Sequence, residues 1–266
     1  MLPALVVDPG SAAGLERRDP RDTLGVGKEE AAHQLAALLE ELASLQERLY
    51  AEGRRSVLLV LQGLDASGKD GTIRRVFTGV NPQGCYVASF KVPTPEEAAH
   101  DFLWRVHKKV PGKGEIGIFN RSHYEEVLVV RVHELVPKGV WSGRYELIRE
   151  FEQMLIETGT VIVKFFLFID RDEQRERLQE RYDNPKKRWK FSMGDIEERA
   201  LWDQYMKAYE DALSETSTAD SPWYVIPSNK NWFRDLAIAS ILAETMDDLK
   251  PAYPEPPDLP KDIVIE

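Results

Sequence analysis

Hydrophobic residues along the chain gather in short continuous runs, and between these runs they recur every three or four positions. Continuous runs predict strands that are buried on both faces, and helical spacing predicts the helices that cover them. We expect strands at residues 56–62, 85–90, 115–119, 161–169 and 223–227. We expect helices at residues 72–77, 95–109, 124–134, 143–157, 172–181, 195–213 and 232–249. This alternation predicts an α/β protein, a three-layer α/β/α sandwich with a five-stranded parallel sheet.

The region before the first expected strand divides into two parts. Residues 1–27 show no clear periodicity and are expected to lie over the surface. The stretch EEAAHQLAALLEELASLQERLYAEG has leucines at helical spacing, which predicts a long helix that ends at Gly53. Its apolar stripe fits packing on the core and contact with a second copy equally well. We therefore expect an N-terminal segment and long helix packed on the core over residues 1–52, the main domain over 53–250, and a proline-rich acidic tail over 251–266.

Composition narrows the class of protein. The chain has 266 residues, of which 42% are hydrophobic, as expected for a globular protein with a substantial core. No apolar run reaches the roughly 18 to 20 residues of a membrane helix, and the N-terminus lacks the pattern of a secretory signal. The single cysteine, Cys85, excludes an internal disulfide framework. We expect a cytoplasmic protein without a membrane partner.

The charge of the chain is acidic overall but unevenly distributed. A formal net charge of −10 argues against binding to nucleic acid, which needs a cationic surface. The stretch RYDNPKKRWK, residues 181–190, nevertheless concentrates basic residues. A cationic strip on an acidic protein indicates a local site for an anion.

The stretch GLDASGKDGT, residues 63–72, has the Gly-x4-Gly-Lys spacing of a phosphate-binding loop (P-loop). This spacing arises by chance in roughly one chain of this size in ten, so the bare motif is weak. The apolar run SVLLVLQ precedes it and a helical pattern follows it. That order lets loop N–H groups and a helix N-terminus converge on a phosphate. We favour a phosphate site over an ordinary strand-turn-helix corner.

Two carboxylates make this loop unusual. Asp70 follows Lys69, where the motif usually has the Ser or Thr that ligates Mg²⁺, and Asp65 lies inside the loop. Anions repel bound phosphate unless a divalent cation lies between them. The loop therefore predicts a strongly metal-dependent phosphate site.

The segment after the third strand, FNRSHYEEVLVVRVHE, offers further candidates. Asn120 and Arg121 occupy the strand end, where open parallel sheets bind ligands, so Arg121 is expected to clamp a phosphoryl group. Glu125 and Glu126 are candidates for holding Mg²⁺ or its waters. For Arg131, an ordinary surface ion pair explains the residue as well as phosphate binding does.

The basic strip follows the fourth strand and a helical pattern. Kinases of this architecture close a cationic lid over the transferring phosphates. We expect such a lid at about residues 181–194, although a charge run is also typical of a solvated face. Its candidate cations are Arg177, Arg181, Lys186, Lys187, Arg188 and Lys190.

Four stretches together resemble polyphosphate kinase family 2, P-loop enzymes that move phosphoryl groups between inorganic polyphosphate and nucleotides. They are LQGLDASGKDGTIRRV, VPTPEEAAHDFLWRVHKKVPGKGEIGIFNRSHYEEVLVVRVHELVP, RYDNPKKRWKFSMGDIEERALWDQY and SNKNWFRDLAIASIL. The resemblance covers about residues 53–249, and the order of the four stretches makes it specific. The Asp after the P-loop lysine is what this family has.

The resemblance implies roles for individual residues. Asp65, Lys69, Arg121 and Glu126 are expected to be catalytic. Mg²⁺, or Mn²⁺ in its place, is expected to bind to ligands among Asp65, Glu125 and Glu126. Phosphate or nucleotide contacts are expected from Gly63, Ala66, Ser67, Gly68, Asp70, Gly71, Thr72, Asn120, Arg131, Arg181, Lys186, Lys187, Arg188 and Lys190.

The chain departs from some members of the family in the segment that contains Arg121. Where those members have FDRSWYNR, this chain has FNRSHYEE, so that Asn120 replaces an aspartate and Glu126 an arginine. The roles of that Asp and Arg cannot be transferred. The variant resembles the third subclass (class III), whose members accept both AMP and ADP, and suggests that Glu126 helps a metal approach the shorter acceptor.

The implied reaction is reversible, direct transfer of the terminal phosphoryl group of polyphosphate to ADP and AMP, without a protein nucleophile. The expected partners are inorganic polyphosphate and adenine nucleotides, and also guanine nucleotides. The resemblance favours a homo-oligomer, either a dimer or a tetramer. Two alternatives remain: an ATP-dependent nucleotide or nucleoside kinase of thymidylate-kinase-like fold, and a non-enzymatic binder of polyphosphate or nucleotide. The clustered carboxylates argue against the binder, because acids beside its ligand would only weaken binding.

Overall fold

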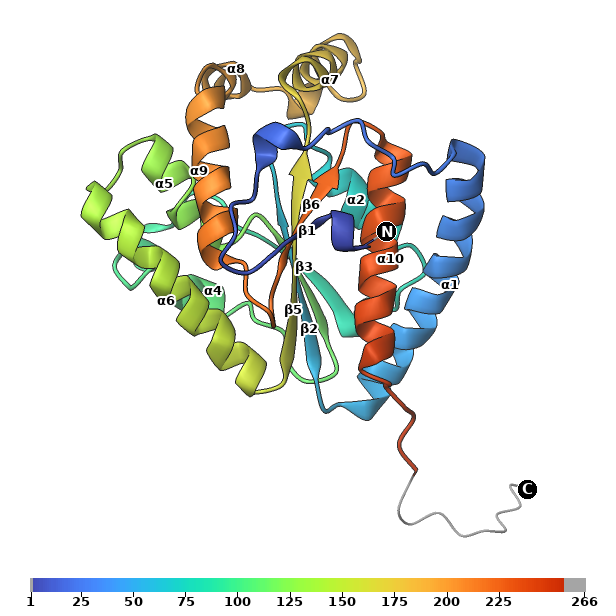
Figure 1. Ribbon diagram of the computed structural model, residues 1–266. Coiled ribbons are helices and arrows are strands. Elements are labelled where there is room, and N and C mark those ends of the chain that lie inside the picture. Colours follow the sequence, from blue (N-terminus) through green and yellow to red (C-terminus); the bar gives the residue numbers. More distant parts are fainter. Residues whose placement is uncertain (1, 256–266) are drawn as a thin grey trace, which may run out of the picture.

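The central sheet of the computed structural model, which describes residues 2–255, has six strands in the order β1-β6-β5-β2-β4-β3 (Figure 1). The strands are β1 (Val6–Val7), β2 (Ser56–Gln62), β3 (Cys85–Ser89), β4 (Ile116–Asn120), β5 (Thr160–Phe168) and β6 (Trp223–Pro227). Strands β2 to β6 are parallel, as predicted, and β1 pairs antiparallel with β6. The sheet thus has one strand more than predicted.

Helices cover both faces of the sheet and its carboxyl edge. They are α1 (Lys28–Glu52), α2 (Lys69–Val76), α3 (Pro95–Ala98), α4 (Trp104–His107), α5 (Val129–Val132), α6 (Lys138–Glu157), α7 (Arg171–Asp183), α8 (Met193–Ala200), α9 (Trp202–Thr216) and α10 (Asn231–Asp248). Short 3₁₀ turns are η1 (Leu2–Ala4), η2 (Leu15–Arg17), η3 (Pro82–Gly84), η4 (His123–Glu126) and η5 (Arg188–Lys190). In Figure 1, α1, α2 and α10 lie on one face, α4, α5, α6 and α9 on the other, and α7 and α8 beyond the strand ends.

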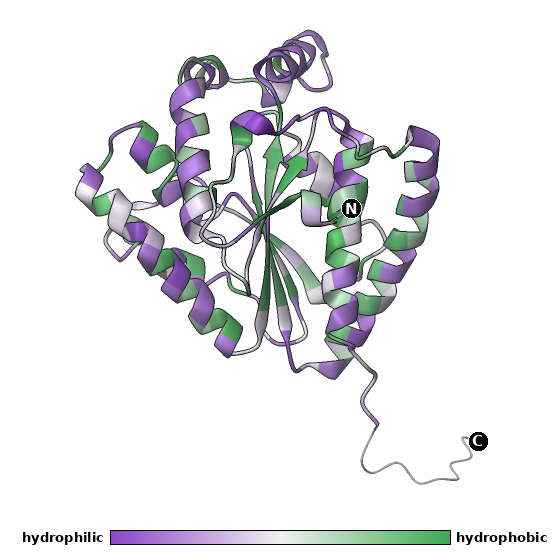
Figure 2. Cartoon of the chain, in the orientation of Figure 1, coloured by the Kyte–Doolittle hydropathy of each residue, from purple (hydrophilic) through white to green (hydrophobic). Residues whose placement is uncertain are grey.

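Strand β2 shows why two helical layers form. Its residues are all buried, and alternate side chains point to opposite faces. Leu58 and Val60 belong to the cluster with α6 and α9, whereas Leu59 and Leu61 belong to the cluster with α1 and α10. Figure 2 shows the apolar colour concentrated in the strands and on the inward faces of the helices. A strand buried on both faces reads as a continuous apolar run, which explains why the sequence predicted it.

The N-terminal segment contributes to the core, which the sequence did not predict. Leu5, Val7 and Leu15 are buried, and β1 extends the sheet next to β6. The guanidinium of Arg18 donates to the carbonyl oxygens of Ala13 and Val6, at 2.9 and 2.8 Å. A two-residue strand is too short to produce a period, so this segment gives no signal in the sequence.

The leucine stripe of α1 packs within the chain rather than on its surface. Leu35, Leu42, Leu45 and Leu49 are buried in the same cluster as the apolar residues of α10. Of the two alternatives for this stripe, the structure shows core packing. No helix among residues 2–255 is both long and apolar enough to cross a membrane. Most of the tail expected over 251–266 lies outside the described residues.

Three predicted helices are interrupted. The one expected over residues 95–109 divides into α3 and α4, because the carboxylate of Asp101 accepts from the N–H of Leu103 and forms a turn that competes with the helix. The one expected over 124–134 divides into η4 and α5, and the one over 195–213 breaks at Leu201 between α8 and α9. Helix α7 agrees with the helix predicted over residues 172–181 to within two residues at each end.

Candidate functional site

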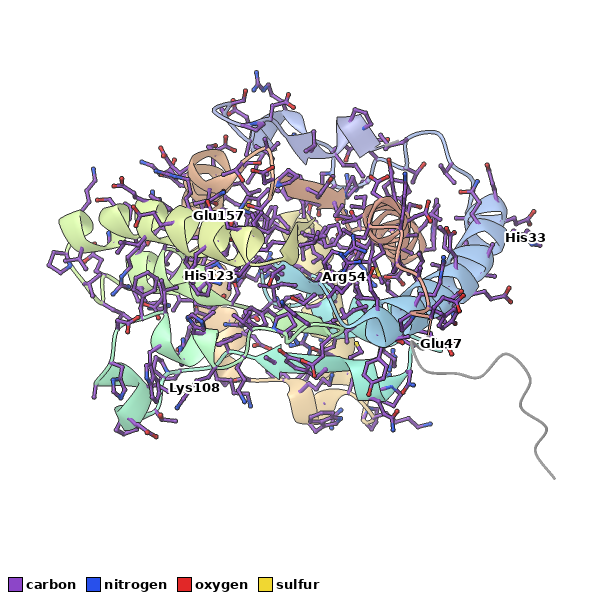
Figure 3. The ribbon with its side chains drawn as sticks, turned by 90° about the horizontal axis from the view of Figure 1, so that it is seen from below. His33, Glu47, Arg54, Lys108, His123 and Glu157 are labelled. Carbon is purple, nitrogen blue, oxygen red and sulfur yellow. The ribbon has the colours of Figure 1, made fainter. Side chains whose placement is uncertain are left out.

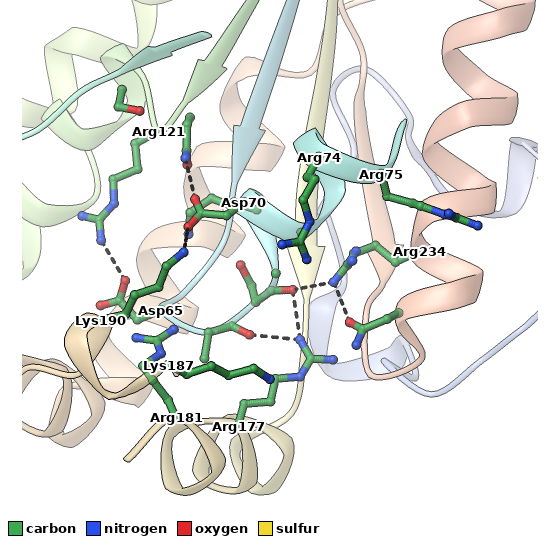
Figure 4. Close-up of a pocket in the computed structure, with 18 of the residues that line it drawn as sticks. Asp65, Asp70, Arg74, Arg75, Arg121, Arg177, Arg181, Lys187, Lys190 and Arg234 are labelled. Carbon is green, nitrogen blue, oxygen red and sulfur yellow. Dashed lines mark hydrogen bonds and ion pairs between the residues drawn. The ribbon is translucent and has the colours of Figure 1, made fainter. Parts of the chain in front are cut away.

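A cavity of about 1260 Å³ opens beyond the carboxyl ends of β2 and β4 (Figure 4). The P-loop, α2, the ends of β3 and β4, α7, the lid and the first turn of α10 form its wall. Of the predicted site residues, it brings together Asp65, Ala66, Ser67, Gly68, Lys69, Asp70, Gly71, Asn120, Arg121, Arg181, Lys186, Lys187 and Lys190. The predicted residues that do not line it are Gly63, Thr72, Glu125, Glu126, Arg131 and Arg188.

The P-loop connects β2 to α2 through left-handed backbone. The φ angles of Gly63, Ala66 and Gly68 are 152°, 64° and 106°. At Gly68 a side chain would also overlap the guanidinium of Arg234. Both the positive φ and this lack of space therefore favour glycine at that position. No side chain caps the start of α2, whose first N–H groups have no partner within the helix. The loop therefore presents a helix N-terminus to the cavity, as a phosphate site requires.

Lys69 is folded back onto its own loop. Its Nζ donates to the carbonyl oxygens of Gly63 and Leu64, at 2.5 and 3.2 Å. Burial and the neighbouring Arg121 lower the pKa of Lys69 to about 8, in spite of nearby carboxylates. The Lys69 amine therefore loses its charge at a pH only slightly above neutral.

Arg121 lies between two carboxylates at the end of β4. It has a left-handed backbone with φ of 61°, and its guanidinium contacts Asp65 at 2.8 Å and Glu125 at 3.4 Å. Burial raises the pKa of Glu125, and the charge of Arg121 opposes that rise. The strand end therefore aims one arginine and one P-loop carboxylate at the same part of the cavity.

Asp70 joins three elements. Its carboxylate accepts from Asn120 Nδ2 at 3.0 Å and from Lys190 Nζ at 2.8 Å, so it connects α2 with the end of β4 and with the lid. The hydrogen bond from Lys190 lowers the pKa of Asp70, and Asn120 adds to the effect. Figure 4 shows Lys190 reaching across the cavity to Asp70.

Three further lid cations, Arg181, Lys187 and Arg188, also have protein partners. Arg181 pairs with Asp195 at 2.9 Å, and Lys187 pairs with Glu180 at 2.6 Å. Arg188 donates instead to the carbonyl oxygen of Tyr182 at 2.7 Å. The Lys187–Glu180 pair is exposed and therefore weak, so a polyanion can exchange it for phosphate at small cost, whereas the Arg181–Asp195 pair is partly buried.

Glu126 and Arg131 lie away from the cavity wall. Glu126 is buried against Arg144 at 2.6 Å and Arg105 at 3.7 Å. Burial raises the pKa of Glu126, while the two arginines oppose the rise. Arg131 pairs with Asp211 at 2.7 Å, the kind of ordinary ion pair that was its alternative explanation.

The cavity wall also contains residues that the sequence did not single out. Arg74, Arg75 and Lys91 add cationic charge on the side of α2 and β3. Arg234 and Asp235 come from the SNKNWFRD stretch, to which no role had been assigned. Their helical spacing is ordinary, so only the resemblance of the whole stretch pointed to them.

Behind the site, a buried polar cluster fixes the segment that follows Arg121. Lys164 Nζ donates to Glu152 at 2.6 Å and to Tyr124 Oη at 3.1 Å. His123 Nε2 lies 3.2 Å from the same carboxylate. Figure 3 places His123 in the interior, whereas His33 lies at the outer edge. His123 is therefore structural.

The fold and this site define a kinase with a P-loop and a cationic lid. A family model, Polyphosphate kinase 2 (PPK2), matches residues 25–254. The chain is 60% identical to the AMP/ADP-polyphosphate phosphotransferase of Meiothermus ruber, over 98% of each chain. It is 52% identical to the ADP-polyphosphate phosphotransferase of Rhodopseudomonas palustris, over 86% of this chain and 83% of that one. The crystal structure of polyphosphate kinase 2 from Arthrobacter aurescens TC1 superposes with a TM-score of 0.92, at 43% identity over 96% of this chain and 92% of that one.

The chain therefore belongs to the polyphosphate kinase 2 family. Kinases of this family generally use a divalent metal ion. Among residues 2–255, no three or more His, Cys, Asp and Glu side chains form a preformed metal cage. Asp65 and Asp70 nevertheless place carboxylates beside the P-loop. This donor set fits Mg²⁺, which is commonly held by one or two carboxylates together with substrate phosphates.

Proposed function

We propose that this protein transfers the terminal phosphoryl group of inorganic polyphosphate to ADP and to AMP, in a reversible reaction. The observation that supports it most is the cavity whose wall joins the P-loop lysine, Arg121 and the lid cations. The donor and the acceptors are taken from the names of the Meiothermus and Rhodopseudomonas relatives. Acceptance of both nucleotides follows the Meiothermus relative, which is similar over nearly the whole chain.

The reaction is an in-line displacement. An oxygen of the acceptor's terminal phosphate attacks the end phosphorus of polyphosphate and forms a P–O bond. The bond from that phosphorus to the bridging oxygen breaks, and its electron pair leaves with the shortened chain. No protein nucleophile takes part, so the protein contributes positioning and electrostatic stabilisation.

The side chains have distinct proposed roles. The N–H groups of residue 66 and residues 68–71 hold phosphate oxygens, and Lys69 moves from the carbonyl oxygens of its loop to the transferring phosphoryl group. Arg121 stabilises charge on that group, while Asp65 orients Arg121 and holds the metal. Asp65 would hold Mg²⁺, or Mn²⁺ in its place, and the ion would supply Lewis-acid charge stabilisation. Arg181, Lys186, Lys187 and Lys190 close over the polyphosphate.

Glu125 and Glu126 act in this proposal through the arginines that they contact, whereas Asp65 also holds the metal. Glu125 contacts Arg121 and so fixes its direction. Glu126 is held by Arg144 and Arg105 and adjusts the acceptor end of the site for AMP. The proposal includes guanine nucleotides as acceptors, a cytoplasmic location and no nucleic-acid partner. It also includes assembly as a dimer or tetramer, which light scattering of the purified protein tests.

The test is a panel of donors and acceptors. Purified protein with Mg²⁺ is given long-chain polyphosphate or ATP as donor and AMP, ADP, GMP or GDP as acceptor, and the products are separated by chromatography over time. The proposal predicts ADP and ATP from AMP, and ATP from ADP, with polyphosphate as donor. ATP formation from ADP alone would refute dual acceptance. If ATP phosphorylates AMP and polyphosphate phosphorylates none of the acceptors, the protein is an ATP-dependent kinase instead.

A further inference from the structure

The carbonyl oxygens of the P-loop all have donors within the chain. Lys69 Nζ donates to those of Gly63 and Leu64, and the N–H of Thr72 donates to that of Gly68. The three carbonyls between them, at residues 65–67, cannot be reached by the backbone of α2. Side chains from two distant helices hold these three instead.

The first two donors lie one turn apart on α7. Gln174 Nε2 donates to the carbonyl oxygen of Asp65 at 3.0 Å. Arg177 Nη1 donates to those of Ala66 and Ser67, at 3.0 and 3.1 Å. Gln174 is buried and does not line the cavity, so it has no access to a substrate.

Arg177 has no N–H left for a phosphate. Its Nε donates to Glu173 at 2.7 Å, and its Nη2 donates to the carbonyl oxygens of Ser228 and Asn229, at 2.6 and 3.2 Å. With the two Nη1 bonds, all five donors of the guanidinium are engaged by the protein. Arg177 was expected among the lid cations, but this geometry makes it a structural support of the loop.

The third donor comes from the opposite side, on α10. Arg234 Nη1 lies 3.5 Å from the carbonyl oxygen of Ser67 and also donates to Asn231 Oδ1 at 2.7 Å. The Nε and Nη2 of Arg234 both donate to Asp235 Oδ1, at 2.9 and 2.7 Å. Its guanidinium fills the space beside Gly68 that a side chain would need. Figure 4 shows Arg177 and Arg234 converging on the loop from different elements.

We propose that Gln174, Arg177 and Arg234 form a carbonyl clamp, a set of positioning residues that holds the P-loop in its phosphate-binding conformation before substrate arrives. When a loop turns its N–H groups towards an anion, its carbonyls must point away from it. The clamp gives those carbonyls fixed partners on the outer side. It also supports the left-handed backbone of Ala66, which costs free energy at a residue other than glycine.

The clamp has a consequence for affinity. If a fraction of the loops is in the binding conformation, the apparent dissociation constant rises in inverse proportion to that fraction. Loss of one clamp hydrogen bond is therefore expected to weaken phosphate binding about three- to tenfold. This inference rests on the proposed function, since it takes the loop to bind the phosphates of the donor.

Gln174→Met tests the clamp, because it removes the Nε2 donor, preserves volume and touches no ligand. It also removes Oε1, which accepts from Arg199 Nη1 at 3.0 Å. The matched control is Gln179→Met on the same helix, where the amide is exposed and bonds only to Asp183. Binding of tripolyphosphate at 25 °C by calorimetry, and hydrogen exchange of the amides of residues 63–72, are measured for both variants. Arg234→Lys is the second variant, and it keeps the charge while losing the forked geometry.

The clamp predicts that Gln174→Met and Arg234→Lys raise the dissociation constant about three- to tenfold. Loop amides should exchange faster in the free protein, and tripolyphosphate should remove most of that difference. Gln179→Met should change neither quantity. A lower melting temperature with unchanged affinity and unchanged loop exchange would overturn the clamp. Absence of tripolyphosphate binding by the unaltered protein would overturn the proposed function instead, while loop exchange would still test the clamp.

Discussion

Asp70 stands directly after the P-loop lysine, where P-loop proteins usually have a hydroxyl that ligates the metal. In this protein its carboxylate contacts Asn120 and the lid residue Lys190. The residue that weakens the ordinary motif therefore fastens the lid to the loop. A bound polyphosphate can take Lys190 from Asp70, so the same contact releases a cation when the substrate arrives.

Asp70→Asn is expected to loosen the lid. An exposed ion pair contributes about 0.2 to 1 kcal/mol, so trypsin should cleave within residues 184–192 about two- to fivefold faster at low salt. The difference should vanish near 1 M salt, where the pair is screened. Asp172→Asn, which breaks an exposed pair with Arg175 on α7, is the control. Equal cleavage rates for Asp70→Asn and the unaltered protein at low salt would show that the contact does not restrain the lid.

Lys69 predicts a pH dependence of the free enzyme. Its pKa is lowered to about 8, so the charged amine predominates below that pH and is lost above it. Because a neutral amine cannot oppose phosphate charge, kcat/KM for polyphosphate should fall as the pH rises through about 8. Lys69→Arg should lack this fall, although at lower activity, because its guanidinium stays protonated. A profile for the unaltered enzyme that is flat to pH 9.5 would contradict the assignment.

Glu126 predicts a difference between the two acceptors. It contacts Arg105, whose Nη1 donates to the carbonyl oxygen of Lys91 at 2.7 Å, and Lys91 lines the cavity. Glu126→Gln should therefore lower kcat/KM for AMP about ten- to a hundredfold, the effect of losing a charged hydrogen bond, and lower that for ADP less. The melting temperature of the same variant shows how much stability is lost with the ion pairs. An equal loss with both acceptors would refute an acceptor-specific role.

At the scale of elements, β5 and α6 are joined to the segment after β4 by Lys164 and Glu152. Both side chains are buried. Burial opposes ionisation, but Lys164 and His123 lower the pKa of Glu152 to about 2. The pair therefore stays charged in the core, where an unmatched partner would be costly.

Lys164→Met should destabilise the protein by about 3 to 5 kcal/mol, since it leaves Glu152 buried without its partner. The double variant Lys164→Met, Glu152→Gln should recover part of that loss, because neither charge remains. Urea unfolding of the three proteins measures both effects. A cost below about 1 kcal/mol for Lys164→Met would mean that water or another group satisfies Glu152.

The elements also show what sequence patterns can and cannot predict. Four of the five parallel strands are recognisable because they are largely buried on both faces and read as continuous apolar runs, whereas β3 is an edge strand with Val87 exposed. Strand β1 has two residues and no period, and it depends on Arg18 and on β6 for its place. The break near Asp101 depends on one side-chain hydrogen bond within an otherwise helical pattern. Local competition of this kind is visible only once the backbone is known.

At the scale of the whole molecule, the site is assembled from stretches that lie far apart in the sequence. The P-loop, the end of β4, the lid and the start of α10 meet at the carboxyl edge of the sheet. Their cations surround one cavity, although the net charge of the chain is −10. The acidic surplus lies elsewhere, so the average charge of the protein says little about its site.

The same scale explains which site residues the sequence could predict. Lys69 and Arg121 follow strands directly, so motif spacing and the rule for strand ends find them. Gln174 and Arg234 act through carbonyl oxygens about 110 and 167 positions away, and no local pattern marks such contacts. Glu126 was expected beside the metal, and its side chain instead lies between two arginines. Tertiary hydrogen bonds decide these positions.

The most direct measurement is ATP formation from ADP and polyphosphate by the unaltered protein and by Lys69→Ala, at equal concentration with Mg²⁺. We predict steady ATP formation by the unaltered protein and a loss of at least about a hundredfold in the variant, whose circular dichroism should be unchanged. Comparable rates from the two proteins would contradict the central claim that the P-loop cavity performs the transfer.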